Sequence, residues 1–437
     1  MADRRSSLLL AGYRLAGALM TPFAPVLLAR RAARGKEDRD RLKERQGIAS
    51  GPRPAGPLVW VHAASVGETN AVLPLLTALL DRGLSVLLTT VTVTGAAVAS
   101  LRLPKGALHQ FAPLDLPAYV ARFLAHWRPA LALFVESEIW PATVSALGDR
   151  GIPLALVNAR MSPRSYGRWL RLRGPGREIF GRIALCLAQS TDDAGRLGEL
   201  GARDSRAVGN LKFDVPPPAV DASVFAALEQ AVRGRPVFVA ASTHSGEESV
   251  VVAAAQVLRT TAPELLTVIV PRHPTRGPEV ASTVTSAGMR PALRSAGALP
   301  STDTDVYIAD TVGELGLFYR LSPFAFVGGS LVPRGGQNPI EPVRLGAAVL
   351  HGPHVVNFTD VYRTLDNGGG AAAVADAPSL AEAARRWLTR PGDAKKAASA
   401  GAAALAPYVG ALERTLAALD PLLHAALGTG PRLPDCA

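Results

Sequence analysis

The sequence predicts an α/β protein of two doubly wound domains, each with a parallel sheet between layers of helices. Three observations lead to this prediction. The chain has 437 residues, more than one ordinary core can hold. Short apolar runs alternate with helical patterns, and this rhythm stops at three consecutive prolines, Pro216–Pro218, before it starts again. The composition, with 48% hydrophobic and 19% charged residues, is that of a globular protein and identifies no function.

The first predicted element is the apolar segment LLLAGYRLAGALMTPFAPVLL at 8–28, in which Arg14 is the only charged residue. Its length is close to the roughly 20 residues of a membrane crossing, but Pro22 and Pro25 should break its last turn. Four alternatives stay open: a spanning helix, an amphiphilic anchor in the interface, a secretory signal and a core helix. Basic residues stand where a signal would be cleaved, and they predict that the following chain stays cytoplasmic: Arg30, Arg31 and Arg34.

Positive charge is concentrated near the N-terminus. The net charge of the whole chain is +11, and residues 1–53 hold twelve basic and five acidic residues, a net +7. Such a surface attracts anionic partners such as an acidic membrane or a phosphorylated lipid. Its confinement to one segment argues against an extended nucleic-acid groove. Cys186 and Cys436, the two cysteines, can build neither a disulfide framework nor a cysteine metal site, which fits a reducing compartment.

The predicted strands are apolar runs without alternation, bounded by turn residues, as in buried parallel sheets. In the first domain they are 58–63, 85–91, 130–136, 153–159 and 183–189, with helical stretches such as 71–83 and 116–127 between them. In the second domain they are 236–243, 265–273, 305–310, 323–330 and 347–353. The linker prediction, VPPPAVD at 215–221, separates the two sets. We therefore assign 1–48 to a membrane-associating segment, 49–214 to the first domain and 215–437 to the second.

In doubly wound sheets, ligands bind beyond the carboxyl ends of the strands, and polar residues gather at these junctions. The first junction is HAASVGE (62–68). Ser65 and Glu68 have the spacing of a capping box, in which both side chains satisfy backbone N–H groups at a helix start. A glycine before the glutamate could instead let the turn bring the carboxylate to a ligand. The pattern alone leaves both interpretations open.

Two further stretches of the first domain carry charge. FVESEIWP places Glu136 and Glu138 after a strand, and Pro141 suggests a turn that brings both carboxylates to a cleft; a solvated pair is the alternative. NARMSPRS and the residues after it hold five arginines, which suit a phosphorylated substrate. An arginine-rich helix surface is the alternative there. The arginines closest to the strand end are Arg160 and Arg164.

The second domain repeats the arrangement with phosphate-binding chemistry. Ser242 and Thr243 precede a helix, whose N-terminus favours a phosphate, although an ordinary helix cap is the alternative. Arg272 and His273 directly follow a strand between two prolines, and each can contact an anion, although a solvated loop is the alternative.

The glycine-rich stretch FVGGSLVPRGGQNPIEP spans 326–342. Its two glycine pairs predict a backbone that approaches a ligand closely with free N–H groups. Residues at the following helix start could accept hydrogen bonds from a sugar's hydroxyls. Neither a phosphate-loop nor a dinucleotide fingerprint is present, and a plain loop is the alternative. The candidate residues are Gly329, Ser330, Gly336, Gln337, Asn338 and Glu341.

Eight stretches in one order resemble the 3-deoxy-D-manno-octulosonic acid (Kdo) transferases, which add Kdo to lipid A in Gram-negative bacteria: HAASVGE, ESEIWP, NARMSPRS, GNLKFD, PRHPTR, DTVGELG, GGSLVPRGGQNPIEP and GPHVVNF. The resemblance covers nearly the whole chain. It implies a glycosyltransferase-B fold, with two Rossmann-like domains facing across a cleft. It also implies inverting transfer from the donor CMP-Kdo to a lipid A precursor, lipid IVA, in lipopolysaccharide biosynthesis at the cytoplasmic face of the inner membrane. Neither metal, cofactor nor nucleic acid is expected.

The resemblance also implies roles for individual residues. Glu68 corresponds to the family's general base, Glu138 belongs to the acceptor side of the catalytic site, and Glu136, Arg160 and Arg164 are expected to bind the acceptor. The donor-binding residues are expected to be Ser242, Thr243, Arg272, His273, Val312, Gly313, Gly329, Ser330, Gly336, Gln337, Asn338 and Glu341.

The sequence departs from the family pattern at Val312, where methionine is frequent, and at Arg334 and Gln337, where histidines are common, so the side-chain roles at these three positions stay open. Two alternatives to the transferase remain. One is a nucleotide-sugar 2-epimerase of the same fold, and the other is a peripheral membrane or nucleic-acid binding protein without catalysis.

Overall fold

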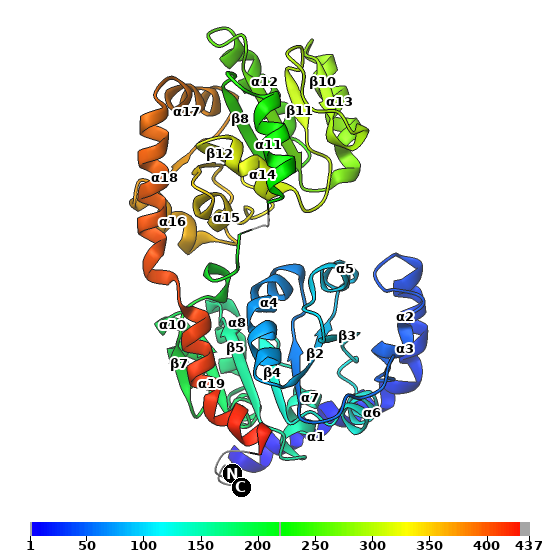
Figure 1. Cartoon of the computed structure of the whole chain (residues 1–437). Helices are drawn as coiled ribbons and strands as arrows, with labels where there is room; N and C mark the ends of the chain where they lie inside the picture. Colours follow the sequence, from blue (N-terminus) through cyan, green and yellow to red (C-terminus); the bar gives the residue numbers. More distant parts are fainter. Residues whose placement is uncertain (1, 218–219, 429–437) are drawn as a thin grey trace. The chain divides into compact units, whose positions relative to one another are not determined.

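The protein consists of two compact units, each built on its own parallel sheet. The structure is a computed structural model that describes residues 2–217 and 220–428. One unit comprises Met1–Val215 together with Tyr408–Ala437, and the other comprises Pro216–Pro407 (Figure 1). The predicted α/β fold with two parallel-sheet domains is confirmed.

The first unit contains a seven-stranded sheet in which all neighbouring strands are parallel. Its strands are β1 (Leu58–His62), β2 (Ser85–Thr90), β3 (Leu108–Phe111), β4 (Leu131–Val135), β5 (Leu154–Ala159), β6 (Leu185–Ala188) and β7 (Ser205–Ala207). The order across the sheet is β3-β2-β1-β4-β5-β6-β7. The central strands β1, β4 and β5 are buried along their whole length, because helices cover both faces of the sheet.

The helices of the first unit form the two covering layers. They are α1 (Ala2–Met20), the 3₁₀ turn η1 (Thr21–Phe23), α2 (Ala24–Ala33), α3 (Leu42–Arg45), α4 (Val66–Asp81), α5 (Val93–Arg102), α6 (Pro117–Trp127), α7 (Pro141–Gly148), α8 (Pro163–Arg171), α9 (Arg173–Gly181), α10 (Thr191–Glu199), η2 (Leu211–Phe213) and α19 (Ala411–Leu427). Helices α4, α5 and α19 pack on one face of the sheet. Helices α6, α7, α9 and α10 pack on the other.

The second unit repeats this plan. Its strands are β8 (Val237–Thr243), β9 (Leu266–Pro271), β10 (Pro291–Leu293), β11 (Val306–Ile308), β12 (Phe324–Val327), β13 (Ala348–His351) and β14 (Ala371–Ala373). They are all parallel, in the order β10-β11-β9-β8-β12-β13-β14. Its helices are α11 (Ala222–Ala231), α12 (Glu247–Arg259), η3 (Pro274–Arg276), α13 (Gly277–Ser286), η4 (Arg294–Ala296), α14 (Leu315–Leu321), α15 (Ile340–Arg344), α16 (Thr359–Asn367), α17 (Ala377–Thr389) and α18 (Pro391–Leu405), followed by η5 (Ala406–Tyr408).

In each sheet, successive strands are first added on one side of the unit's first strand and later on its other side. The position between these two sets of strands is the topological switch point. In the first unit this point lies between β1 and β4, and in the second it lies between β8 and β12. Strand ends diverge at such switch points and leave a crevice for a ligand. The sequence motifs HAASVGE and ESEIWP follow β1 and β4, so both reach the first switch point. The segments after β8 and β12 reach the second.

The predicted domain limits need two corrections. The boundary between the two units lies between Val215 and Pro216, one residue from the predicted boundary. The predicted range 215–437 for the second domain is nevertheless wrong at its end. The final helix α19, red in Figure 1, belongs to the first unit. Asp214 accepts hydrogen bonds from the backbone N–H groups of Gly410 and Leu412, at 2.7 and 2.6 Å. The leucines of α19 then join the core under the first sheet.

The second correction concerns the predicted separate segment 1–48, which is part of the first unit. Glu37 and Arg45 are both buried and form an ion pair of 3.2 Å. Glu44 accepts the backbone N–H of Phe111 at 2.7 Å and so attaches α3 to the edge strand β3. The prolines at 22 and 25 interrupt the apolar segment between α1 and α2, as predicted. Within the described ranges, none of the helices is both long enough and apolar enough to cross a membrane.

Candidate active site

Three carboxylates gather at the switch point of the first sheet. Glu68 lies in the first turn of α4, directly after β1, and Glu136 and Glu138 follow β4. Their negative charges act on one another, since those of Glu136 and Glu138 both contribute to the elevated pKa of Glu68. The structure therefore brings together the three acidic residues that the sequence singled out in two separate motifs.

The Glu68 side chain is enclosed and hydrogen-bonded at both oxygens. The residue is 8% exposed. Its Oε2 accepts the backbone N–H of Ala64 at 2.8 Å, and its Oε1 accepts the hydroxyl of Ser65 at 2.8 Å. Ser65 in turn accepts the backbone N–H of Glu68 at 3.4 Å. The S-x-x-E pair thus caps the start of α4, but the glutamate reaches the N–H of Ala64, one residue before the position it takes in a standard capping box.

Capping does not remove the basicity of Glu68. Burial, reinforced by the charges of Glu136 and Glu138, raises the pKa of Glu68 to about 7, against the lowering effect of its two hydrogen bonds. Burial acts in this direction because a carboxylate loses hydration when it is enclosed. A carboxyl with such a pKa is divided about equally between acid and base at neutral pH, as a general base requires.

Glu138 is held in its ionised form by two aromatic side chains. The indole N–H of Trp140 donates to its Oε2 at 2.7 Å, and Nε2 of the buried His62 lies 3.8 Å from the same atom. Burial alone would raise the pKa of Glu138, but the contacts with His62 and Trp140 bring it below its usual value. Nδ1 of His62 shares a hydrogen bond of 2.9 Å with Thr89, which fixes the ring.

Glu136 is paired with a lysine from a distant part of the chain. Nζ of Lys212 lies 2.9 Å from its Oε1. Lys212 belongs to η2, whose backbone is held by the Asn158 side chain through the N–H of Leu211 at 2.9 Å. Glu136 and Asn158 both have left-handed backbones, with φ of 57° and 51°. Residues other than glycine adopt this conformation at a cost, and such strain gathers at functional sites.

The two arginines predicted to bind the acceptor lie on the surface of the same unit. Arg160 follows β5 and Arg164 lies in the first turn of α8, and both are exposed. Arg168 and Arg171 continue the same face of α8 at helical spacing. This side of the unit therefore presents a row of cations.

In the second unit, the glycine-rich loop after β12 is not the open set of donors that the sequence predicted. The buried Glu247 carboxylate accepts the backbone N–H groups of Gly329, Ser330 and Leu331 at 2.7–2.9 Å. It also accepts the N–H of His244 at 2.9 Å. The N–H of Gly336 is bonded to the carbonyl of Gly329 at 2.7 Å. The prediction of free backbone N–H groups at Gly329, Ser330 and Gly336 is therefore wrong.

The residues at the start of α12 are also turned to internal partners. Thr243 is fully buried, and its hydroxyl donates to the buried Glu248 at 3.0 Å. Ser242 precedes it with a left-handed backbone, φ 56°. Because carboxylates fill the first turn of this helix, the predicted phosphate site at Ser242 and Thr243 is occupied by the protein's own acids.

A cationic cluster stands at the same end of the second sheet. Arg272 and His273 follow β9 and are exposed. The His273 ring stands edge-on to that of His244, with centroids 6.1 Å apart. Burial lowers the pKa of His244, and the nearby positive groups His273, Arg334 and Arg272 lower it further, against the opposing charge of Glu247. An anion placed here would meet several cations at once.

The other predicted donor residues surround this cluster. The Gln337 amide lies 3.1 Å from Nε2 of His244, and Asn338 donates to Glu341 at 3.2 Å. Val312 is 74% exposed beside Gly313, whose φ is 87°. An apolar side chain so exposed next to a permissive backbone offers a flat contact for a ring. Among the described residues, no group of three or more His, Cys, Asp or Glu side chains could hold a metal ion.

Residues 40–215 match the 3-deoxy-D-manno-octulosonic-acid transferase (kdotransferase) family. The 3-deoxy-D-manno-octulosonic acid transferase of Bordetella pertussis is 38% identical to this chain over 416 residues, which is 93% of both chains. The transferase of the same name from Haemophilus influenzae is 35% identical over 395 residues, 88% of this chain and 92% of the relative. This chain belongs to the Kdo transferases. It is a Kdo glycosyltransferase, as the ordered motifs predicted.

The fold of this Kdo transferase is shared more widely. The UDP-GlcNAc 2-epimerase of Neisseria meningitidis, solved with UDP-GlcNAc, superimposes with a TM-score of 0.54 at 14% identity over 83% of this chain and 99% of the epimerase. That identity shows a common fold only. The sequence relatives over nearly the whole chain are Kdo transferases, which favours this activity over the epimerase alternative.

Three residues of the candidate site were not assigned from the sequence. Lys212 lies in the GNLKFD motif between Leu211 and Phe213, and its side chain is partly buried. His244 directly follows the predicted Ser242–Thr243 pair. Glu247 lies at the start of the following helix, and only the fold shows that its carboxylate reaches a loop more than eighty residues later.

Proposed function

We propose that the protein transfers Kdo from CMP-Kdo to the lipid A precursor lipid IVA, with inversion at the anomeric carbon. The observation that supports this best is the enclosed Glu68, whose pKa is raised to about 7 beside two further carboxylates. A general base in this position is worth roughly 100- to 10,000-fold in rate.

In the proposed reaction, the Glu68 carboxylate takes the proton of the acceptor hydroxyl while that oxygen attacks the anomeric carbon of Kdo. The bond from this carbon to the CMP phosphate breaks, and CMP leaves with the electron pair. Each Glu68 oxygen keeps a free lone pair beside its hydrogen bond, so the carboxylate can accept the proton without leaving the helix start. Glu138, fixed by Trp140, would orient the acceptor.

The second unit would bind the donor through side chains. CMP-Kdo carries a phosphate and a sugar carboxylate, and the exposed Arg272 and His273 offer donors for both. His244 and Gln337 line the same cluster. We assign the cytosine to the surface at Val312 and Gly313, and the ribose hydroxyls to Glu341.

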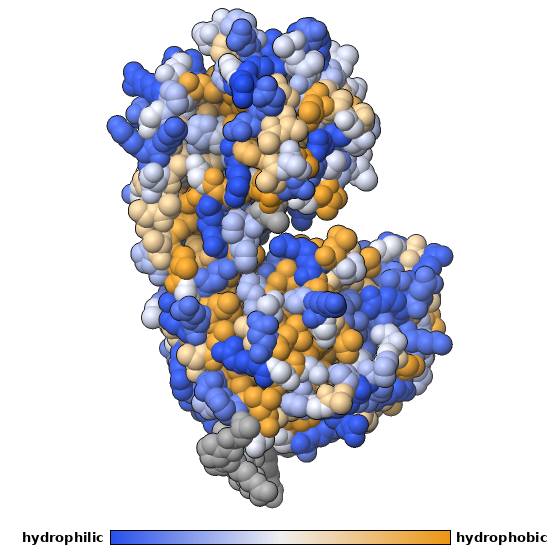
Figure 2. Space-filling model, viewed as in Figure 1, coloured by the Kyte–Doolittle hydropathy of each residue, from blue (hydrophilic) through white to orange (hydrophobic). Residues whose placement is uncertain are grey.

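Association with the cytoplasmic face of the inner membrane is the second part of the proposal. Monomeric soluble proteins rarely expose large groups of apolar side chains, and such groups often mark interaction sites. In the N-terminal helices, eight apolar residues are more than half exposed: Leu8, Leu9, Leu15, Leu19, Met20, Phe23, Val26 and Leu27. Exposed basic residues follow them in the chain, at Arg30, Arg34, Lys36, Arg39 and Lys43. On the face of the first unit in Figure 2, apolar and hydrophilic residues lie side by side. Binding to anionic vesicles should weaken when Phe23 and Leu27 are both replaced by aspartate, and unchanged binding would contradict this part.

Mass analysis of the lipid product tests the reaction. Incubation of the protein with CMP-Kdo and lipid IVA should yield a lipid that is heavier by one or more Kdo residues. At an equal amount of folded enzyme, the Glu68→Gln protein should form this product at least about 100-fold more slowly. A Glu68→Gln protein that transfers at nearly the wild-type rate would exclude Glu68 as the base. Incubation with UDP-GlcNAc and no acceptor tests the epimerase alternative, for which no product is expected.

A further inference from the structure

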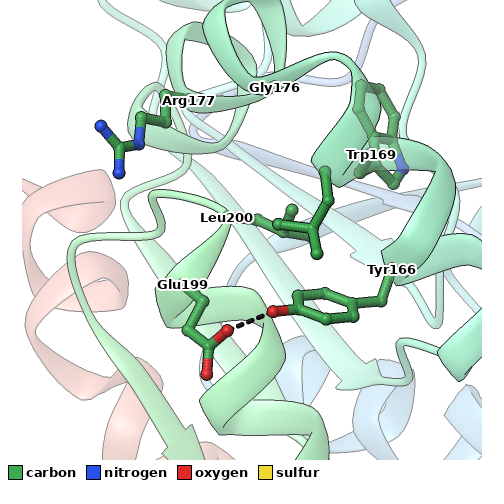
Figure 3. A pocket seen from close by; sticks show the side chains of 7 residues that line it. Tyr166, Trp169, Gly176, Arg177, Glu199 and Leu200 are labelled. Atoms are coloured by element: carbon green, nitrogen blue, oxygen red, sulfur yellow. Dashed lines mark hydrogen bonds between the residues drawn. The ribbon is translucent and has the colours of Figure 1, made fainter.

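Two grooves of the first unit meet at one tryptophan. The first, of about 380 Å³, is lined by the apolar side chains of Ile139, Met161, Trp169 and Leu172. The second, of about 400 Å³, shares Trp169 with the first and is also lined by Tyr166, Leu170 and Leu200, with Gly176 in its wall (Figure 3). Each volume lies in the range of sites that bind small molecules, roughly 300–1,000 Å³.

The first groove begins at the carboxylate loop. Ser137 and Ile139, which line it, flank Glu138 in the chain. Ile139 also lines a smaller cavity of about 250 Å³ with Tyr13 of α1. Helix α1 packs against α9, the helix that carries Gly176. Ile139 therefore connects the cavity beside α1 with the first groove, and Trp169 connects the first groove with the second.

The rim of the grooves is cationic. Arg164, Arg168 and Arg171 stand at i, i+4 and i+7 on α8, and the Arg177 guanidinium stands at the edge of the second groove in Figure 3. None of these four makes an ion pair within the described part of the chain. The one acid in the second groove, Glu199, accepts the hydroxyl of Tyr166. The combination suits an amphiphile with an apolar chain and an anionic head.

The geometry points to these grooves as the site for the acyl chains of the acceptor glycolipid, with its phosphorylated sugar over the arginines of α8. This inference rests on the proposed function and adds to it how the acceptor is recognised. A glycolipid held in this way would present its sugar hydroxyl beside the loop of Glu136 and Glu138. It could also enter from the apolar surface of α1 without passing through water.

A glycine offers a variant that narrows the second groove. Gly176 lies within α9 and does not have a positive φ. An added Cβ would meet only Trp169, at 3.5 Å from its carbonyl oxygen and 3.7 Å from its Cε3, which are ordinary contacts. Leucine also has a higher helix propensity than glycine. Gly195→Leu in α10 is the matched control, because that glycine is exposed, lines neither groove and has open space around it.

The test compares kcat/KM for the acylated acceptor and for the same acceptor with its acyl chains removed. Gly176→Leu should lower kcat/KM at least tenfold for the acylated acceptor and less than twofold for the deacylated one, while Gly195→Leu changes neither. Leu172→Asp, at a half-exposed position of the first groove, should reproduce the selective loss by placing a charge against the chain.

Equal kcat/KM of Gly176→Leu and Gly195→Leu on the acylated acceptor would overturn the inference. An equally large loss of kcat/KM on the deacylated acceptor would also overturn it, since the groove would then not bind the acyl chains. If the wild-type protein transferred Kdo to neither acceptor, the proposed function itself would fail, and this inference with it. Transfer to both acceptors at equal kcat/KM would leave the proposed function standing and overturn the groove alone.

Discussion

At the scale of single residues, Glu68 combines a helix-capping role with the proposed role of general base, which sequence patterns treat as alternatives. Its carboxylate caps α4 through Ala64 and Ser65, and the same enclosure raises its pKa. The S-x-x-E spacing predicts the first role from local geometry. The second depends on burial and on two acids that follow another strand, which no local pattern contains.

The elevated pKa of Glu68 predicts the pH dependence of transfer. A base must be ionised to accept a proton, so activity needs pH above the pKa, which lies at about 7. We expect kcat/KM to be level above pH 8 and to fall about tenfold for each pH unit below about 7. The measurement is a pH profile of kcat/KM at constant ionic strength. A profile that is flat between pH 5 and 8 would remove Glu68 from the role of base, whereas the residual activity of Glu68→Gln should itself be flat.

The same pKa predicts a cost in stability. The folded protein binds a proton at Glu68 up to about pH 7, while in the unfolded chain the carboxyl has its ordinary pKa of 4.5. The folded state therefore binds more protons between these values, and stability is full below pH 4.5 and declines as pH rises through 7. The loss amounts to about 3 kcal/mol, at roughly 1.4 kcal/mol per pKa unit.

Glu68→Gln removes this titration. The stability of the variant relative to the wild type should therefore increase by about 2–3 kcal/mol between pH 5 and pH 8. Denaturant unfolding at the two pH values measures this difference. A constant offset from the altered capping bonds cancels in the comparison. A relative stability that stays the same at both pH values would show that the Glu68 pKa is not raised in the folded state.

At the scale of elements, the sequence predicts the strands that consist of apolar runs. It does not predict the strands that form only because they pair with a distant part of the chain. All ten predicted strands correspond to central strands, because helices cover both of their faces and leave continuous apolar stretches. The four missed strands are short, and all of them lie at sheet edges: β3, β7, β10 and β14. β7 and β14 are also the most exposed, and neither contains a β-branched or aromatic side chain that would indicate a strand.

For the glycine-rich loop after β12, the motif predicts the backbone conformation but not the partners of its N–H groups. Two glycine pairs predict a backbone with free donors, and this is correct in conformation, since Gly329 and Gly336 have φ of 67° and 76°. The donors nevertheless point at Glu247 of a separate helix. The loop is therefore shaped by an internal carboxylate, and we propose that neighbouring side chains such as Arg272 and Gln337 bind the ligand in its place.

Glu247→Gln should destabilise the second unit. The carboxylate accepts four backbone N–H groups, and an amide would turn a donor toward some of them, leaving buried N–H groups without an acceptor. We expect a loss of roughly 3–5 kcal/mol, measured by denaturant unfolding. Glu279→Gln, at an exposed position in the same unit, is the control and should cost less than 1 kcal/mol. Equal effects of the two substitutions would contradict the role of Glu247.

At the scale of the whole molecule, the chain crosses between its two units twice. The sequence marks the first crossing with three prolines. The second is marked only by the short connection with Pro407 and Gly410 between the alanine-rich α18 and the alanine- and leucine-rich α19. Which unit receives α19 is decided by contacts. Leu419, Leu422 and Leu423 are buried against the first sheet, and Arg414 donates to the carbonyl of Val208 at 2.8 Å.

A chain that ends before Tyr408 should therefore lose stability in the first unit and keep it in the second. Removal of α19 uncovers the apolar surface under the first sheet, and the three buried leucines alone represent roughly 5 kcal/mol or more of burial. We expect the first unit to unfold at lower denaturant, measured by fluorescence of Trp60 and Trp127, while Trp387 in the second unit reports an unchanged midpoint. A chain ending at Gly428, which retains α19, is the control and should match the full chain. If truncation before Tyr408 shifted only the Trp387 transition, α19 would belong to the second unit, and the sequence-based limit at 437 would be restored.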